Sequence, residues 1–277
     1  KNNKIEIYDD KKSSIPKNLK KNSINKTKLT SVNFDRIVVS PGIDINKCTL
    51  KKYLSKNKSK IISELDIFYL NNIKNKKITI TGTNGKSTTS KLLHDVLKKH
   101  GKDVRLVGNI GNPLLLEKNI KPKTIFVIEA SSYQIEYSKY FKTDFAIILN
   151  ISPNHLERHR TFKNYIKSKF GLIKSQKKNS FAFIEKNNNF LKEELKKNKI
   201  NSKIIKVNLK ISNKIKKKIK NSYFENKNNQ NNLIHCYLSL FFKINEIISS
   251  FKSFKLDQNQ LLNIIKSILL NHSKNYN

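Results

Sequence analysis

Several residue types are rare or missing in this sequence, and each gap limits what the protein can be. There is no methionine and no tryptophan, and the only two cysteines, Cys48 and Cys236, lie far apart with no neighbours at metal-ligand spacing. We therefore expect buried free thiols in a reducing compartment. No apolar run approaches the roughly 18 residues of a membrane span, and the first residues lack a signal-peptide core. These gaps favour a cytoplasmic protein without a membrane segment.

Acidic residues are also scarce. There are 20 of them against 57 lysines and arginines, which gives a formal net charge of +37. An excess of this size normally indicates a nucleic-acid partner. Here lysine is spread almost evenly and is accompanied by asparagine and isoleucine, which indicates compositional drift along the whole chain. We therefore expect no specific nucleic-acid partner, and a nucleic-acid-stimulated ATPase remains the less favoured alternative.

A β-branched strand, a short glycine loop and a helix follow one another in the middle of the chain. Gly82 and Gly85 allow the loop to turn and to direct backbone N–H groups at an anion. Lys86 is placed to reach phosphate oxygens, and the hydroxyl of Ser87 is placed to ligate Mg²⁺. Ile80 stands where the general P-loop pattern has its first glycine. The stretch is therefore a shortened P-loop and predicts ATP binding.

Near-continuous apolar strands alternate with helical patterns after this loop. The predicted strands are 104–107, 125–128, 145–149, 181–184 and 204–207, and the predicted helices include 86–100 and 161–175. This alternation is typical of an α/β fold with a mostly parallel sheet covered on both faces. Ligands in such sheets bind at the carboxyl ends of the strands.

The pattern divides the chain into two main regions. A first region over 1–75 has a predicted strand at 36–40 and, at 61–65, either a strand or a strand that runs into a helix, and a second region containing the P-loop starts at residue 76. The second region is expected to end in two amphipathic helices that begin near residues 232 and 257.

Polar side chains follow two of the predicted strands. Glu129 ends the strand 125–128 and is placed to ligate Mg²⁺ or to order its waters, although it could instead cap the helix near Ser131. His155 follows the strand 145–149 and is expected to bind a metal or phosphate, and Arg158 could contact a phosphate.

Together these motifs resemble the Mur ligases of peptidoglycan synthesis. The motifs are Gly82–Thr88, Gly108–Gly111, Glu129–Glu136, Leu149–Ile151 and His155–His159. The resemblance runs from about residue 35 to residue 235. The segments Ser40–Ile43 and Ser131–Glu136 are most similar to the members that join D-glutamate to UDP-N-acetylmuramoyl-L-alanine.

The resemblance implies a role for each motif. ATP would be held by the loop residues Gly82, Thr83, Asn84, Gly85, Lys86, Ser87 and Thr88, and by Asn229 and Asn232 at the adenine. The resemblance implies two Mg²⁺ ions, one served by Ser87 and Glu129, the other by His155 and a carbamylated Lys169. Lys86, Lys169 and His155 would be the catalytic residues. Asn109 would contact the γ-phosphate or the substrate, and Ser40, Pro41 and Gly42 would lie along the uridine nucleotide.

The implied reaction is an ATP-dependent amide ligation by a monomeric enzyme of cell-wall synthesis, and so of cell shape and division. The substrate's L-alanyl carboxylate would attack the γ-phosphate to give an acyl phosphate, and the amine of D-glutamate would then displace phosphate.

The sequence departs from the family pattern at several places. Asn154 replaces an aspartate and Asn228 replaces the first histidine of the adenine motif. The resemblance implies that 1–75 is a partial, Rossmann-like N-terminal domain without its first strand and glycine turn, and that 76–270 is the central P-loop ATPase domain. It implies that 271–277 is a stub of the third domain, which carries the D-glutamate site in the family. With no initiator methionine, we expect a piece of a longer product. An ATP-binding remnant of a split or decayed ligase gene is therefore the alternative.

Overall fold

The computed structural model describes residues 4–99 and 101–207, and these residues form two compact units. The first unit ends at Ser63 and the second begins at Glu64. The sequence predicts this division between residues 75 and 76. The difference arises because α3 (Glu64–Asn71) packs within the second unit, against α5 and the short helix η4. The buried carboxylate of Asp66 on α3 accepts hydrogen bonds from the backbone of residues 139–141.

The first unit contains short elements around one small parallel pair. Strands β1 (Ile37–Val38) and β2 (Ile61–Ile62) pair in parallel. The remaining elements are η1 (Lys12–Ser14), η2 (Lys17–Asn22), α1 (Lys26–Ser31), α2 (Lys51–Lys56) and η3 (Lys58–Lys60). Cys48 is a free, partly buried thiol. The expected strand at 36–40 is present but only two residues long, and 61–65 is a two-residue strand that runs into a helix, as the second of its two alternatives had it.

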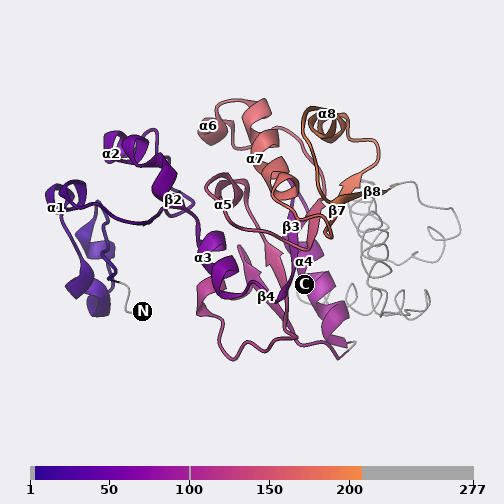
Figure 1. Cartoon of the computed structure of the whole chain (residues 1–277), viewed down its shortest axis with the longest axis horizontal. Helices are drawn as coiled ribbons and strands as arrows, with labels where there is room; N and C mark the ends of the chain where they lie inside the picture. The colour runs from indigo at the N-terminus through magenta and orange to yellow at the C-terminus, as the bar shows by residue number, and fades with distance from the viewer. Residues whose placement is uncertain (1–3, 100, 208–277) are drawn as a thin grey trace, which may run out of the picture. The chain divides into compact units, whose positions relative to one another are not determined.

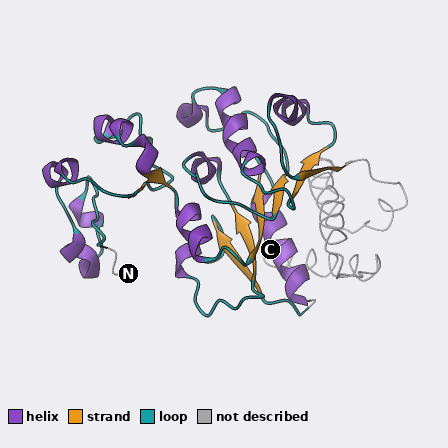
Figure 2. Cartoon of the chain, viewed as in Figure 1, coloured by secondary structure: helices purple, strands orange, loops and turns teal. Residues whose placement is uncertain are grey.

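The second unit is built on a sheet of six parallel strands. They are β3 (Lys76–Thr81), β4 (Val104–Gly108), β5 (Ile125–Glu129), β6 (Phe145–Ile148), β7 (Phe181–Glu185) and β8 (Lys203–Val207). Their order is β4-β5-β3-β6-β7-β8, so the strand that leads into the glycine loop is central, with β5 and β6 as its neighbours. Figure 2 shows the strands side by side between helices. The structure confirms the α/β class and all six strands predicted in this unit.

Helices cover both faces of this sheet. Side chains alternate between the faces along each strand, so Ile78 and Val127 pack with α4 (Lys86–Lys99), whereas Phe126 and Ile128 pack on the opposite face. That second face is covered by α3, α5 (Ser132–Glu136), α7 (Phe162–Lys174) and α8 (Asn189–Lys197) (Figure 1). The two remaining short helices are η4 (Leu114–Leu116) and α6 (Leu156–His159).

Helix α7 begins and faces the core as its sequence dictates. The side chain of Thr161 caps its first turn by accepting from the backbone N–H of Asn164 at 3.1 Å. Its buried positions recur at three and four residues and include Tyr165, Lys169 and Phe170. A lysine therefore lies on the apolar face of this helix.

Some expectations fall on residues outside the described ranges. These are Cys236, the helices expected near 232 and 257, the stub at 271–277, and the adenine-motif residues Asn228, Asn229 and Asn232. Within the described part of the chain, no helix is both long enough and apolar enough to cross a membrane.

Candidate functional site

Hydrogen bonds hold the glycine loop to Asn150, which follows the neighbouring strand β6. The backbone N–H groups of Thr83 and Asn84 donate to Oδ1 of Asn150 at 3.1 and 2.8 Å, and Nδ2 of Asn150 donates back to the carbonyl of Asn84 at 3.0 Å. Gly85 closes the loop with φ +77°, a conformation that other residues adopt at a cost. Two of the loop's N–H groups are therefore already used, which leaves those in the first turn of α4 for an anion.

Thr83 is part of the loop's internal structure. Its side chain is buried, and its hydroxyl accepts from the N–H of Ser152 at 3.0 Å and lies 3.1 Å from the hydroxyl of Tyr165. Ser87 and Thr88, by contrast, are exposed on the first turn of α4. Of these three predicted phosphate-site hydroxyls, only the two on α4 are open to a ligand.

Two lysines come together beneath the loop. Nζ of Lys86 donates to the carbonyl of Thr83 at 2.9 Å. Nζ of Lys169 donates to the carbonyl of Gly82 at 2.9 Å and lies 4.7 Å from the ring centre of Tyr165. Only 1% of Lys169 is exposed.

The surroundings of these two lysines lower their pKa values. Burial, reinforced by the charge of Lys86, lowers the pKa of Lys169 to about 7, against an opposing effect of Glu129. Burial also lowers the pKa of Lys86, again opposed by Glu129. The amine of Lys169 can therefore lose its proton near neutral pH.

Glu129 supplies a buried carboxylate at the same edge of the sheet. It pairs in register with Ile80 of β3, and only 1% of it is exposed. Oε1 accepts from Nδ2 of Asn109 at 3.0 Å, whereas Oε2 is buried and has no hydrogen-bond partner among the described residues. The backbone of Gly108 packs closely against that of Glu129. Only glycine fits there, because a Cβ at residue 108 would lie 2.3 Å from the carbonyl oxygen of Glu129.

The alternative role of Glu129 as a helix cap is wrong. The cap of α5 is Ser131, whose hydroxyl accepts from the N–H of Gln134 at 3.2 Å, while the Gln134 side chain accepts from the Ser131 N–H at 2.8 Å. Glu129 is left with one unsatisfied oxygen.

That oxygen fits a magnesium ion. Mg²⁺ takes oxygen ligands and usually keeps several waters and substrate phosphates. The buried carboxylate oxygen without a donor and the exposed hydroxyl of Ser87, on the first turn of α4, provide such ligands. No group of three or more His, Cys, Asp or Glu in the described ranges could hold a metal by itself. An ion here would thus need hydroxyl, phosphate or modified-lysine ligands as well.

His155 lies at the same rim, one contact away from the loop. It starts α6 with φ +52°, and its imidazole is half-exposed. Its ring centre is 6.4 Å from that of Tyr165, which itself contacts Thr83 and Lys169. The N–H of His155 donates to Oδ1 of Asn154 at 2.9 Å. The asparagine thus retains an oxygen acceptor where the family pattern has aspartate.

The residues expected at a uridine nucleotide belong to the first unit. Ser40, Pro41 and Gly42 follow β1 in the first unit, where the N–H of Ile43 donates to the carbonyl of Ser40 at 3.0 Å. Their expected role at a uridine nucleotide stays a prediction.

Sequence reasoning missed the two residues that hold the loop, Asn150 and Tyr165. Asn150 lies two residues beyond the end of β6, as Glu129 lies at the end of β5, and that position was the available signal. The suggestion that Arg158 contacts a phosphate is not supported. Arg158 is 8% exposed, and its guanidinium lies 3.1 Å from a carboxylate oxygen of Glu136.

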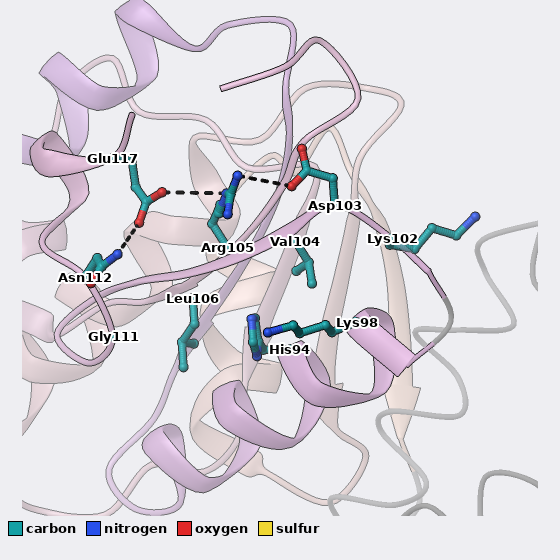
Figure 3. Close-up of a pocket in the computed structure, with 10 residues that line it drawn as sticks. All are labelled: His94, Lys98, Lys102, Asp103, Val104, Arg105, Leu106, Gly111, Asn112 and Glu117. Carbon is teal, nitrogen blue, oxygen red and sulfur yellow. Dashed lines mark hydrogen bonds and ion pairs between the residues drawn. The ribbon is translucent and has the colours of Figure 1, made fainter. Parts of the chain in front are cut away.

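A separate cavity of about 310 Å³ lies along the outer edge of β4 (Figure 3). Its charged groups face one another: Arg105 lies between Asp103, at 3.4 Å, and Glu117, at 3.8 Å. None of the predicted site residues lines it.

Comparison with known proteins identifies the family. A model of the Mur ligase middle domain matches residues 80–268, which is more than half of the chain. The chain belongs to the Mur ligase family. In this Mur ligase, the matched segment begins inside the central strand and includes the glycine loop, Glu129, His155 and Lys169.

The curated relatives of this Mur ligase are longer proteins. It is 37% identical over 158 residues to UDP-N-acetylmuramoylalanine–D-glutamate ligase of Caldicellulosiruptor bescii, an alignment that covers 57% of this chain and 34% of the relative. It is 42% identical over 191 residues to the enzyme of the same name from Elusimicrobium minutum, covering 64% of this chain and 42% of the relative. The alignments thus span well under half of either relative.

Solved structures of Mur ligases also align with the chain. A MurF ligase from Thermotoga maritima in complex with ADP aligns over 68% of this chain and 41% of its own, with a TM-score of 0.41 and 20% identity.

Proposed function

We propose that the second unit binds ATP, and that the chain is part of a ligase that joins D-glutamate to UDP-N-acetylmuramoyl-L-alanine. One observation carries the proposal: the ammonium groups of Lys86 and Lys169 and the unpartnered oxygen of Glu129 meet where β3 and its neighbour β5 end. The names of the curated relatives support the choice of substrates.

Each group has a defined part in phosphoryl transfer. The triphosphate would lie at the first turn of α4, where unpaired N–H groups and the ammonium of Lys86 offset its negative charge. Ser87 and Glu129 would hold one Mg²⁺, and His155 with a carbamylated Lys169 would hold a second. Bound Mg²⁺ would neutralise phosphate charge and orient the γ-phosphoryl group.

Lys169 is suited to carbamylation because its amine is partly neutral near pH 7. The nitrogen lone pair adds to the carbon of CO₂, the nitrogen loses a proton, and a carboxylate replaces the ammonium. Carbamylation would therefore replace the positive charge of Lys169 beside Lys86 with a carboxylate whose oxygens can bind a metal ion.

The proposed chemistry has two displacement steps. A carboxylate oxygen of the L-alanyl group attacks the γ-phosphorus and ADP leaves, which gives an acyl phosphate. The amine of D-glutamate then attacks the acyl carbon, phosphate leaves, and the nitrogen loses a proton as the amide forms. The protein's main task is to align two anions that repel each other.

The wider assignments belong to the same proposal. The first unit would contact the uridine nucleotide through Ser40, Pro41 and Gly42. We propose a monomer that acts in the cytoplasm on cell-wall precursors, with no specific nucleic-acid partner and no membrane attachment.

ATP binding by the 277-residue chain tests the proposal, measured by calorimetry with and without Mg²⁺. The net charge of +37 attracts anions nonspecifically, so the titration belongs at high ionic strength. We expect saturable binding that Lys86→Ala weakens at least tenfold. Lys91→Ala is the matched control, because Lys91 is exposed on the same helix and pairs with Asp95. Equal binding by the two variants would contradict the proposal.

A second assay addresses the substrate. ATP, Mg²⁺ and UDP-N-acetylmuramoyl-L-alanine are supplied together with hydroxylamine, which converts an acyl phosphate into a stable hydroxamate. Hydroxamate and ADP in equal amounts support the proposed first step. ATP binding without either product would limit this chain to nucleotide binding.

A further inference from the structure

We propose that Arg158 is a positioning residue that holds His155 at the metal edge of the site. The inference rests on the proposed function, because the metal role of His155 is part of it. It concerns a group that makes no direct contact with the proposed ligands and acts through a tyrosine ring.

Arg158 is anchored on α5 by charge and by aromatic rings. Its guanidinium is 3.1 Å from a carboxylate oxygen of Glu136 and hydrogen-bonds the hydroxyl of Tyr137. Its central carbon lies 5.4 Å from the ring centre of Tyr133 and 5.2 Å from that of Tyr137. With 8% of its surface exposed, this cation is desolvated, a setting in which ring and ion-pair contacts are strongest.

The ring of Tyr133 connects Arg158 to His155, because it contacts both side chains. Its ring centre lies 5.1 Å from the imidazole centre of His155, and its hydroxyl lies 3.4 Å from a carboxylate oxygen of Glu157. The Tyr133 ring therefore contacts both Arg158 and His155. A change in the guanidinium's position shifts the surface against which the imidazole packs.

The backbone at His155 needs such support. A non-glycine residue at φ +52° is unfavourable by itself, and α6 is only four residues long, too short to be stable alone. A second tie joins α6 to α5, since Nε2 of His159 lies 2.9 Å from the hydroxyl of Ser132. Helix α6 is also tied to α7, where Nδ2 of Asn164 donates to the carbonyl of His159 at 3.0 Å, so contacts with both α5 and α7 hold it in place.

This arrangement links the two proposed metal ligands. The chain leaves β5 at Glu129 and enters α5, and it leaves β6 and reaches α6 at His155. Because Arg158 ties α6 to α5, it fixes the segment that carries the imidazole to the segment that follows the carboxylate. Loss of Arg158 would leave both ligands present, with α6 held only by its other contacts and the imidazole of His155 less firmly placed.

The first test needs no nucleotide. The imidazole Hε1 resonance of His155, assigned by its loss in His155→Ala, reports the nearby Tyr133 ring. We expect it to shift toward the unstructured value in Arg158→Gln and in the milder Glu136→Gln. The control is Arg160→Gln, an exposed arginine two residues away, which is expected to leave the resonance in place.

The second test measures coupling between ATP and metal as the ratio of the ATP dissociation constants in EDTA and in Mg²⁺. Arg158→Gln is expected to reduce this ratio about tenfold while ATP binding in EDTA is unchanged, as for other residues that orient metal ligands. His155→Ala should reduce it at least as much, and the double variant no further than His155→Ala alone. Arg160→Gln should match the wild type.

The outcomes separate this inference from the proposed function. An unshifted His155 resonance in a folded Arg158→Gln, or an undiminished coupling ratio accompanied only by a lower melting temperature, would overturn the positioning role. Full ATP binding by Lys86→Ala would instead refute the nucleotide site, and the resonance alone would then decide whether Arg158 holds His155.

Discussion

The ammonium of Lys169 lies 2.9 Å from the carbonyl oxygen of Gly82, so a lysine from α7 supports the phosphate loop from below. The two residues are 87 positions apart in the chain. The contact places the amine directly behind the glycine loop, where burial and the charge of Lys86 lower its pKa to about 7.

Lys169 should make the protein more stable as the pH rises above neutrality. Below pH 7 the lysine is charged in both the folded and the unfolded state. Between about 7 and its ordinary value of 10.5, the folded state has lost the proton while the unfolded state keeps it, so rising pH favours folding. Denaturant titrations from pH 7 to pH 10 should show a smaller rise for Lys169→Met than for the wild type.

The control for that series is Lys167→Met, an exposed lysine two residues away. It should follow the wild-type pH dependence. If Lys169→Met rises with pH as steeply as the wild type, Lys169 is charged in the folded state and the lowered pKa is wrong.

Asn150 should matter for both stability and nucleotide binding. Asn150→Ala removes the acceptor for two loop N–H groups and the donor to the Asn84 carbonyl. We expect a loss of about 1–3 kcal/mol in the free energy of unfolding and weaker ATP binding, because the loop loses its fixed shape. Denaturant melts and calorimetry measure the two effects.

Asn179→Ala, in an exposed position before β7, should change neither quantity. ATP affinity unchanged in Asn150→Ala would mean that the loop's conformation does not depend on the amide.

Substitutions at Glu129 and at Ser131 should have separate effects, the first on metal binding and the second on helix capping. Ser131→Ala removes the cap of α5 and should cost about 1 kcal/mol of stability, with the effect of Mg²⁺ on ATP affinity retained. Glu129→Gln should abolish most of the Mg²⁺ effect and leave a folded protein. The reverse pattern, with Ser131→Ala losing the metal effect and Glu129→Gln keeping it, would remove Glu129 from the metal site.

The sheet could be predicted from the sequence because its strands are continuous apolar runs. Buried parallel strands carry that signature whatever their neighbours, and Glu129 was found because a carboxylate ends one of them. Pairing order and burial depend on the folded chain. Lys169 therefore could not be separated from the other lysines by its spacing, although the family resemblance singled it out.

Asn150 and Arg158 both show that contacts between residues far apart in the chain cannot be predicted from local sequence. Asn150 was passed over because its hydrogen bonds are to loop backbone 66 and 67 residues away, which no local pattern reveals. Arg158 was expected to contact a phosphate because it is a cation near a P-loop. In the structure its guanidinium instead contacts Glu136 and two tyrosine rings. Charge type can be read from sequence, whereas its partner cannot.

A crystal structure of the chain with Mn²⁺ and a non-hydrolysable ATP analogue tests the central claim most directly. The account predicts an anomalous peak between the hydroxyl of Ser87 and the free oxygen of Glu129, with Nζ of Lys86 released from Thr83 to contact the phosphates. An analogue bound with its phosphates away from Gly85 and Lys86, or a manganese ion that Glu129 does not touch, would contradict it.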